Sequence, residues 1–169
     1  MTDSQNEQFS QIYDQYIAKI YRFVYLKVDS QETAQDITSK VFLKGWEAFQ
    51  VQRDAVKNPG AFLYQIARNA VVDHYRAKGR SKEVSADASP EIVDPRADAK
   101  EQAILSADIS AIKQSIKKLE PEYQDIIIWH YLDDMTIPEI AKLVDRPAGT
   151  VRVMLHRGLK DLKGLVQES

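Results

Sequence analysis

Apolar side chains in the first half of the chain recur at three- and four-residue spacing, the period of an amphipathic α-helix. One such stripe runs from Phe9 to Val24 and predicts a long helix with one buried face. Another runs from about Pro59 to Ala77, where Asn58 and Pro59 are typical of an N-cap and a first helical residue. The pattern therefore predicts two helices with a further helical segment between them.

The middle segment has an apolar arc wider than one core contact requires. One face carries Ala34, Ile37, Val41 and Ala48. Three aromatic rings lie about a quarter turn away, at roughly 100° per residue: Phe42, Trp46 and Phe49. This segment is predicted to be a helix with more apolar surface than its own core stripe.

Polar residues dominate from Lys78 to about Glu101, where serines, acids and two prolines leave too little apolar surface for a fixed fold. A linker of this length is typical of a joint between domains. We therefore predict a first domain over residues 1–78, a flexible linker over 79–101 and a second domain over 102–169. No segment alternates with the period of a strand, so the fold class is all-α.

The second domain repeats the helical pattern. One helix is predicted to carry Ile104, Ala107, Ile112, Ile116 and Leu119, and the next Tyr123, Ile126, Ile127, Tyr131 and Leu132. A third opens at Thr136, with Glu139 completing a capping box and Ile137, Ile140, Ala141 and Val144 on its inner face. The adjacent acids Asp133 and Asp134 diverge by about 100° in a helix, so they are not a catalytic pair and are expected to end the preceding helix.

The last helix follows the turn DRPAG and separates an apolar face from a cationic one. Val151, Leu155, Leu159, Leu162 and Val166 fall within an arc of about 80°. The remaining arc carries Arg152, His156, Arg157, Lys160 and Lys163. A solvated charged face explains most such helices, but the capped helix and short turn before it favour a helix-turn-helix that binds DNA. Thr150, Arg152 and Val153 would then lie near the end that enters the major groove.

The helix before the linker allows two interpretations. Arg68, Asp73 and Arg76, with Tyr64 and Tyr75 interleaved, are typical of a surface that binds single-stranded nucleic acid. The same residues fit a core helix with an intrahelical pair between Asp73 and Arg76. Spacing alone does not separate these alternatives.

Composition and charge exclude several classes of protein and kinds of site. The 169 residues carry a net charge of −2, which argues against wholesale phosphate binding, but two short windows around Arg76 and Arg152 are locally basic. With no cysteine, the chain has no disulfide or thiolate zinc site. Its histidines are scattered, and no HExxH pair, phosphate loop or nucleophile elbow is present. We expect no enzyme activity, cofactor, metal or membrane insertion, and a cytoplasmic location.

Three strings, in this order, resemble the extracytoplasmic-function (ECF) group of bacterial sigma factors: DITSKVFLKGWEAF, NPGAFLYQIARNAVVDHYRAKGR and LEPEYQDIIIWHYLDDMTIPEIAKLVDRPAGTVRVMLHRGLKDLK. The resemblance implies two helical domains, regions 2 and 4, which bind core RNA polymerase and promoter DNA. It places Asp36, Phe42 and Trp46 on the polymerase, which would supply the partner that the aromatic arc needs. Arg68, Asn69, Asp73 and Arg76 would meet the minus-10 element, and the loop from Gln50 to Asn58 a flipped-out base.

In region 4 the resemblance assigns the minus-35 element to the last two helices, through Arg146, Thr150, Arg152, Val153, His156, Arg157 and Lys160. Relatives often have a small polar residue and an arginine where this chain has Val153 and Met154, which leaves Arg152 as the chief base-reading candidate. An anti-sigma protein is a further implied partner. The alternative function is a stand-alone helix-turn-helix regulator whose first helices dimerise or bind a ligand.

Overall fold

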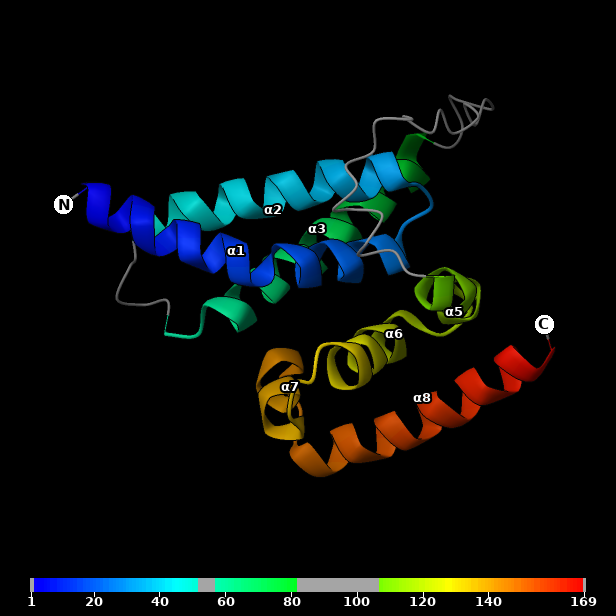
Figure 1. Cartoon of the computed structure of the whole chain (residues 1–169). Coiled ribbons are helices and arrows are strands. Elements are labelled where there is room, and N and C mark those ends of the chain that lie inside the picture. The colour runs from blue at the N-terminus through cyan, green and yellow to red at the C-terminus, as the bar shows by residue number, and fades with distance from the viewer. Residues whose placement is uncertain (1, 52–56, 82–106, 169) are drawn as a thin grey trace. The chain divides into compact units, whose positions relative to one another are not determined.

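The computed structural model describes residues 2–51, 57–81 and 107–168, and every regular element within these ranges is helical (Figure 1). The chain divides into two compact units, with the boundary between Ile104 and Leu105. The all-α prediction is therefore confirmed for the described residues. Most of the predicted linker lies outside them, and its first three residues, 79–81, continue a helix.

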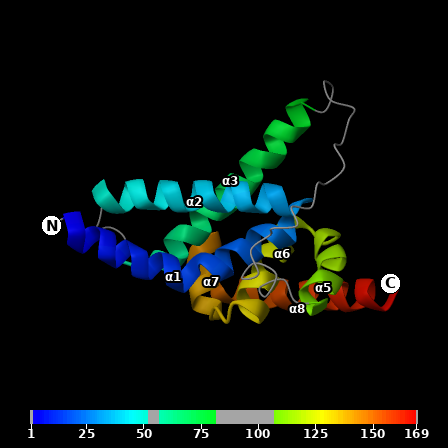
Figure 2. The same cartoon turned by 45° about the horizontal axis from the view of Figure 1, so that its top comes forward.

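The first unit consists of three helices, α1 (Thr2–Lys27), α2 (Gln31–Val51) and α3 (Pro59–Ser81). Figure 2 shows α1 and α2 side by side, with α3 crossing them at an angle. Their shared core contains Ile20, Phe23, Val24, Leu26, Val41, Leu63 and Ala67, each at most 1% exposed. The predicted N-cap is confirmed, because the backbone N–H of Ala61 donates to Oδ1 of Asn58 at 3.1 Å.

The wide aromatic arc of α2 is covered by α1. The ring of Phe42 is 6% exposed and lies edge-on to Tyr13, with centroids 4.9 Å apart. Trp46 is half-buried, 5.2 Å from the ring of Phe9, and Phe49 is buried beside both. The expectation that Phe42 needs a partner outside the chain is therefore wrong, since α1 extends far enough to supply one.

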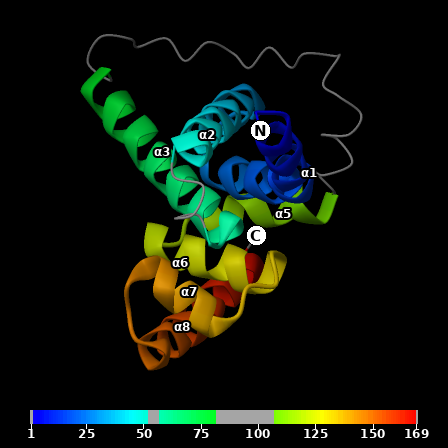
Figure 3. The same ribbon diagram turned by 90° about the vertical axis from the view of Figure 1, so that its left-hand side faces the viewer.

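The second unit consists of α5 (Ala107–Lys117), α6 (Pro121–Ile127), the π-helical turn η2 (Ile128–Leu132), α7 (Ile137–Val144) and α8 (Ala148–Glu168). Both α6 and α7 pack against α8 (Figure 3). The side chain of Gln124 donates to the carbonyl of Leu119 at 2.9 Å, which satisfies a backbone acceptor in the turn after α5.

The π turn contains the aromatic residue that fills the core. The N–H of Asp133 donates to the carbonyl of Ile128, five residues back, at 3.1 Å. Trp129 is fully buried, whereas Tyr131 is 48% exposed. The predicted burial of Tyr131 is therefore wrong: the core is filled by Trp129, which lies three residues after the buried Ile126 on nearly the same side of the helix.

The short helix α7 begins at its predicted cap, but only Ile140 and Ala141 of its predicted inner face are buried, since Ile137 and Val144 are half-buried. Oγ1 of Thr136 accepts from the N–H of Glu139 at 3.3 Å, and the Glu139 carboxylate accepts from the N–H of Thr136 at 3.0 Å, so the capping box is confirmed. Asp145 ends the helix in the left-handed region, with φ of 55°. Leu143 is buried while Val144 is only half-buried, which corrects the predicted inner face.

Candidate functional site

The outer face of α8 is cationic and exposed. Val151 and Leu155 are buried, as predicted, and Met154 is buried beside them at 8% exposure. The exposed residues on this helix include Arg152, Val153, His156, Arg157 and Lys160. The separation of faces is confirmed near the start of the helix, but Val166, predicted as core, is 47% exposed. Met154 belongs to the core and is not available to read DNA.

The start of α8 is open on its outer side. A Cβ atom built on Gly149 would meet nothing within 4 Å in the described part of the chain, and Gly149 itself is exposed. Thr150 is half-buried, and the side chain of Val153 is 49% exposed. The backbone at this end can therefore approach a large partner surface closely, as a recognition helix must.

Arg146 has a partner within the chain that the sequence did not indicate. Its Nη2 lies 2.6 Å from Oε1 of Glu122, in the first turn of α6, and the two side chains are 43% and 37% exposed. The ion pair ties the turn between α7 and α8 to α6. Arg146 was assigned to the minus-35 element, but its positive charge is already paired with the carboxylate of Glu122 within the chain.

On α3 the exposed arc contains Asn69, Asp73 and Arg76, while Arg68 is half-buried. No ion pair joins Asp73 to Arg76 in the part of the chain that the structure describes, so the intrahelical-pair interpretation lacks support there. Tyr64 is 2% exposed and packs edge-on to Phe23, which removes it from any stacking surface. The arc therefore presents polar groups rather than alternating rings.

The last turns of α3 are tied to the corner between α1 and α2. The hydroxyl of Tyr75 donates a hydrogen bond to the carbonyl of Lys27, and Nζ of Lys78 lies 2.5 Å from Oδ2 of Asp29. Burial, with a contribution from the Asp29 carboxylate, raises the pKa of Tyr75 to about 12, so this hydroxyl stays a donor at neutral pH. Sequence reasoning missed this contact, since nothing in the spacing of α3 points to the corner.

The outer face of α2 carries a mixture of charged and apolar groups. Asp36 pairs with Lys40 at 3.1 Å, and both side chains are about two-thirds exposed. Leu43 lies on the same side as Asp36, seven residues on, and is 57% exposed. The exposure of Leu43 could have been predicted from the sequence, because this residue falls outside the buried stripe of the helix. A single exposed leucine is common on protein surfaces, so Leu43 by itself does not define an interface.

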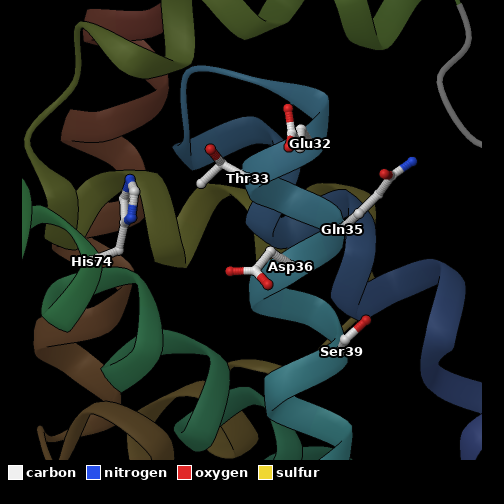
Figure 4. Close-up of a pocket in the computed structure, with 6 residues that line it drawn as sticks. All are labelled: Glu32, Thr33, Gln35, Asp36, Ser39 and His74. Carbon is white, nitrogen blue, oxygen red and sulfur yellow. The ribbon is translucent and has the colours of Figure 1, made fainter. Parts of the chain in front are cut away.

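An open polar pocket of about 460 Å³ lies between α2 and α3 (Figure 4). Its lining consists of Glu32, Thr33, Gln35, Asp36 and Ser39 from α2 and His74 from α3. Burial, followed by the charge of Lys78, lowers the pKa of His74 below its usual value, which favours the neutral ring. Within the described ranges no cluster of His, Cys, Asp and Glu could hold a metal ion.

None of the described helices is long and apolar enough to cross a membrane. The exposed polar arcs of α3 and α8 belong to two separate compact units, each with a buried core of its own. A capped helix, a short turn and a second helix with a cationic outer face define the second unit as a helix-turn-helix domain.

Comparison with known families identifies both units. Residues 12–81 match Sigma-70 region 2, and residues 109–162 match Sigma-70 region 4. The chain therefore belongs to the sigma-70 family, and its relatives place it in the ECF group. It is 29% identical to the ECF RNA polymerase sigma factor SigW of Bacillus subtilis, over 93% of this chain and 88% of SigW. It is 25% identical to BldN of Streptomyces coelicolor, over 96% of this chain but only 61% of BldN.

Two solved structures share the fold. One is the sigma factor RpoE of Bartonella quintana in complex with the anti-sigma factor NepR, with a TM-score of 0.73, 19% identity, and coverage of 95% of this chain and 98% of RpoE. The other is CnrH in complex with the cytosolic domain of CnrY, with a TM-score of 0.64, 17% identity, and coverage of 97% and 90%.

Proposed function

We propose that this chain directs core RNA polymerase to specific promoters, with region 2 reading the minus-10 element and helping to melt it and region 4 reading the minus-35 element. The supporting observation is the family match of both units, in the order of the sigma factors, combined with an exposed polar arc on one helix of each unit. A transcription initiation factor of this kind supplies recognition rather than catalysis, so we assign no enzyme activity to it.

The minus-35 contacts are assigned to the exposed face of α8. Arg152 is the chief base-reading group, because a guanidinium matches the paired acceptors of guanine. Val153, at 49% exposure, can meet a thymine methyl group. Thr150, His156, Arg157 and Lys160 are assigned to the flanking backbone, where cations displace counterions from the phosphates.

The minus-10 contacts are assigned to the exposed arc of α3, through Asn69, Asp73 and Arg76. Arg68 is a further proposed contact, although it is half-buried and lies about 100° round the helix from Asn69, on the same side as Tyr75. The segment proposed to receive the flipped-out base spans residues 50–58; Gln50 and Val51 are the last residues of α2, and residues 52–56 lie outside the described residues. Extrusion of a base costs a few kcal/mol of stacking, which these polar groups and the segment would have to offset.

Core polymerase is proposed to contact the outer face of α2, through Asp36, Leu43 and the exposed edge of Trp46. Phe42 is left out of this surface, since its ring packs within the unit. Because the polymerase acts on chromosomal DNA, the proposed location is the cytoplasm. An anti-sigma protein, as found on RpoE, is a further proposed partner.

The deciding experiment is run-off transcription by core polymerase on templates randomised at both promoter elements, with sequencing of the products. We expect products only when the chain is present, enriched in two short motifs at a fixed separation. A stand-alone regulator would instead bind a duplex site tightly by itself and fail to co-elute with core polymerase, and that result would overturn the proposal.

A further inference from the structure

The C-terminal turns of α3 leave the hydrophobic core. Val71 is 2% exposed, but from Val72 to Gly79 none of the residues is buried. Figure 2 shows this end of the helix extending away from α1 and α2. A short helical segment without a buried face has little intrinsic stability, so its direction depends on the polar contacts that it makes.

Two such contacts reach the same corner of the unit. Tyr75 donates its hydroxyl hydrogen bond to the carbonyl of Lys27, the last residue of α1. One turn further on, Lys78 pairs with Asp29 in the link between α1 and α2, at 2.5 Å. We call these two contacts the corner clasp. The clasp satisfies a carbonyl in the last turn of α1 and places a cation near the negative end of that helix dipole.

The clasp and the promoter-facing arc lie on opposite sides of α3. At about 100° per residue, Asn69, Asp73 and Arg76 fall within roughly 60° of one another. Tyr75 and Lys78 fall on the other side, more than about 100° from the centre of that arc. The clasp therefore holds the helix from behind and leaves the arc free for a ligand.

We propose that Tyr75 and Lys78 are positioning residues for minus-10 recognition: they fix the promoter-facing arc of α3 relative to α2, the helix proposed to face the polymerase. Neither residue is assigned a contact with DNA. The inference rests on the proposed function, since it adds a positional requirement to the minus-10 contacts. Loss of the clasp lets the end of α3 tilt, so that correct and incorrect minus-10 sequences are bound more equally.

The test uses Tyr75→Phe and Lys78→Gln in the full chain with core polymerase, on the templates randomised at both elements. Tyr75→Phe removes one hydrogen bond, so we expect minus-10 preference to fall about two- to tenfold. Preference at the minus-35 element is the internal control and should not change. Tyr13→Phe is the matched control, because it removes the same atom from a ring on α1 that is 40% exposed.

A merely structural role gives a different result, since a partly unfolded chain lowers the yield from every template without changing either preference. Unchanged preferences, or an equal fall at both elements, would overturn the inference. The Lys78 side chain is 53% exposed, so Lys78→Gln keeps the fold, and the reversed pair Asp29→Lys with Lys78→Asp should restore part of the lost preference. If the wild-type chain with core polymerase enriches no sequence motif, that result contradicts the proposed function itself, and it is thereby distinguished from a failure of the clasp.

Discussion

The ion pair between Arg146 and Glu122 allows a direct test of how region 4 meets the phosphate backbone. Glu122→Gln keeps the shape of the side chain and removes its charge, which frees the guanidinium that lies 2.6 Å away. Since the two side chains are 43% and 37% exposed, solvent screens their attraction, and pairs of this kind contribute about 0–1 kcal/mol. The fold should therefore lose less than about 1 kcal/mol of unfolding free energy.

The affinity of region 4 for DNA should rise, although the free energy of unfolding falls slightly. A freed Arg146 can meet a phosphate, and the loss of a carboxylate beside the DNA removes repulsion. With at most about 1 kcal/mol at stake, the affinity for a minus-35 duplex should rise about two- to fivefold. One added phosphate contact should also steepen the slope of log affinity against log salt by about 0.9.

Fluorescence anisotropy of a labelled promoter duplex with the holoenzyme, measured over a series of salt concentrations, gives both quantities. Glu120→Gln is the matched control: it removes the same charge two residues earlier, from an exposed side chain that caps nothing. In an Arg146→Ala background, Glu122→Gln should bring no more gain than Glu120→Gln does, because only the general loss of one negative charge remains. A larger gain there, or an affinity that falls on Glu122→Gln alone, would refute the reasoning.

Three further predictions concern other parts of the chain. Leu43→Ala should weaken core-polymerase binding in a co-elution assay and leave the unfolding free energy within about 0.5 kcal/mol, because the side chain is 57% exposed; a large stability loss would place it in the core. Gly60→Ala should destabilise region 2 by about 1–3 kcal/mol in urea denaturation, since the added Cβ would lie 2.7 Å from the ring of Tyr16; an unchanged midpoint would contradict this close approach. Arg152→Ala should cost about 1–3 kcal/mol at one position of the minus-35 element, whereas equal weakening on all sequences would reduce it to a phosphate contact.

Much of the candidate DNA-binding surface could be predicted because it depends on single helices. The exposed positions of α8 follow from its period, and the cap at Thr136 follows from two residues three apart. The same reasoning went wrong at Val166, since it assumed that the partner of α8 covers a straight stripe along the whole helix. How far that cover extends depends on the lengths and directions of α6 and α7.

The errors elsewhere have the same origin. Periodicity gives the angle of a side chain around its own helix, but it does not say which other helix lies opposite. Phe42 was expected to need an outside partner because nothing in α2 indicates that Tyr13 of α1 lies beside it. Trp129 fills the core in place of Tyr131, and both lie within a π turn, whose wider period leaves no clear trace in the spacing.

The sequence by itself determined the helices, their caps, the all-α class and the order of the two sigma regions, because each of these depends on residues close together along the chain. Only the tertiary structure decided the contacts between distant residues. It tied Arg146 to Glu122 and Tyr75 to the carbonyl of Lys27, and it exposed Leu43 while burying Phe42. Such contacts depend on how whole helices pack, since a side chain meets its partner only where two helices are brought together by the burial of their apolar faces.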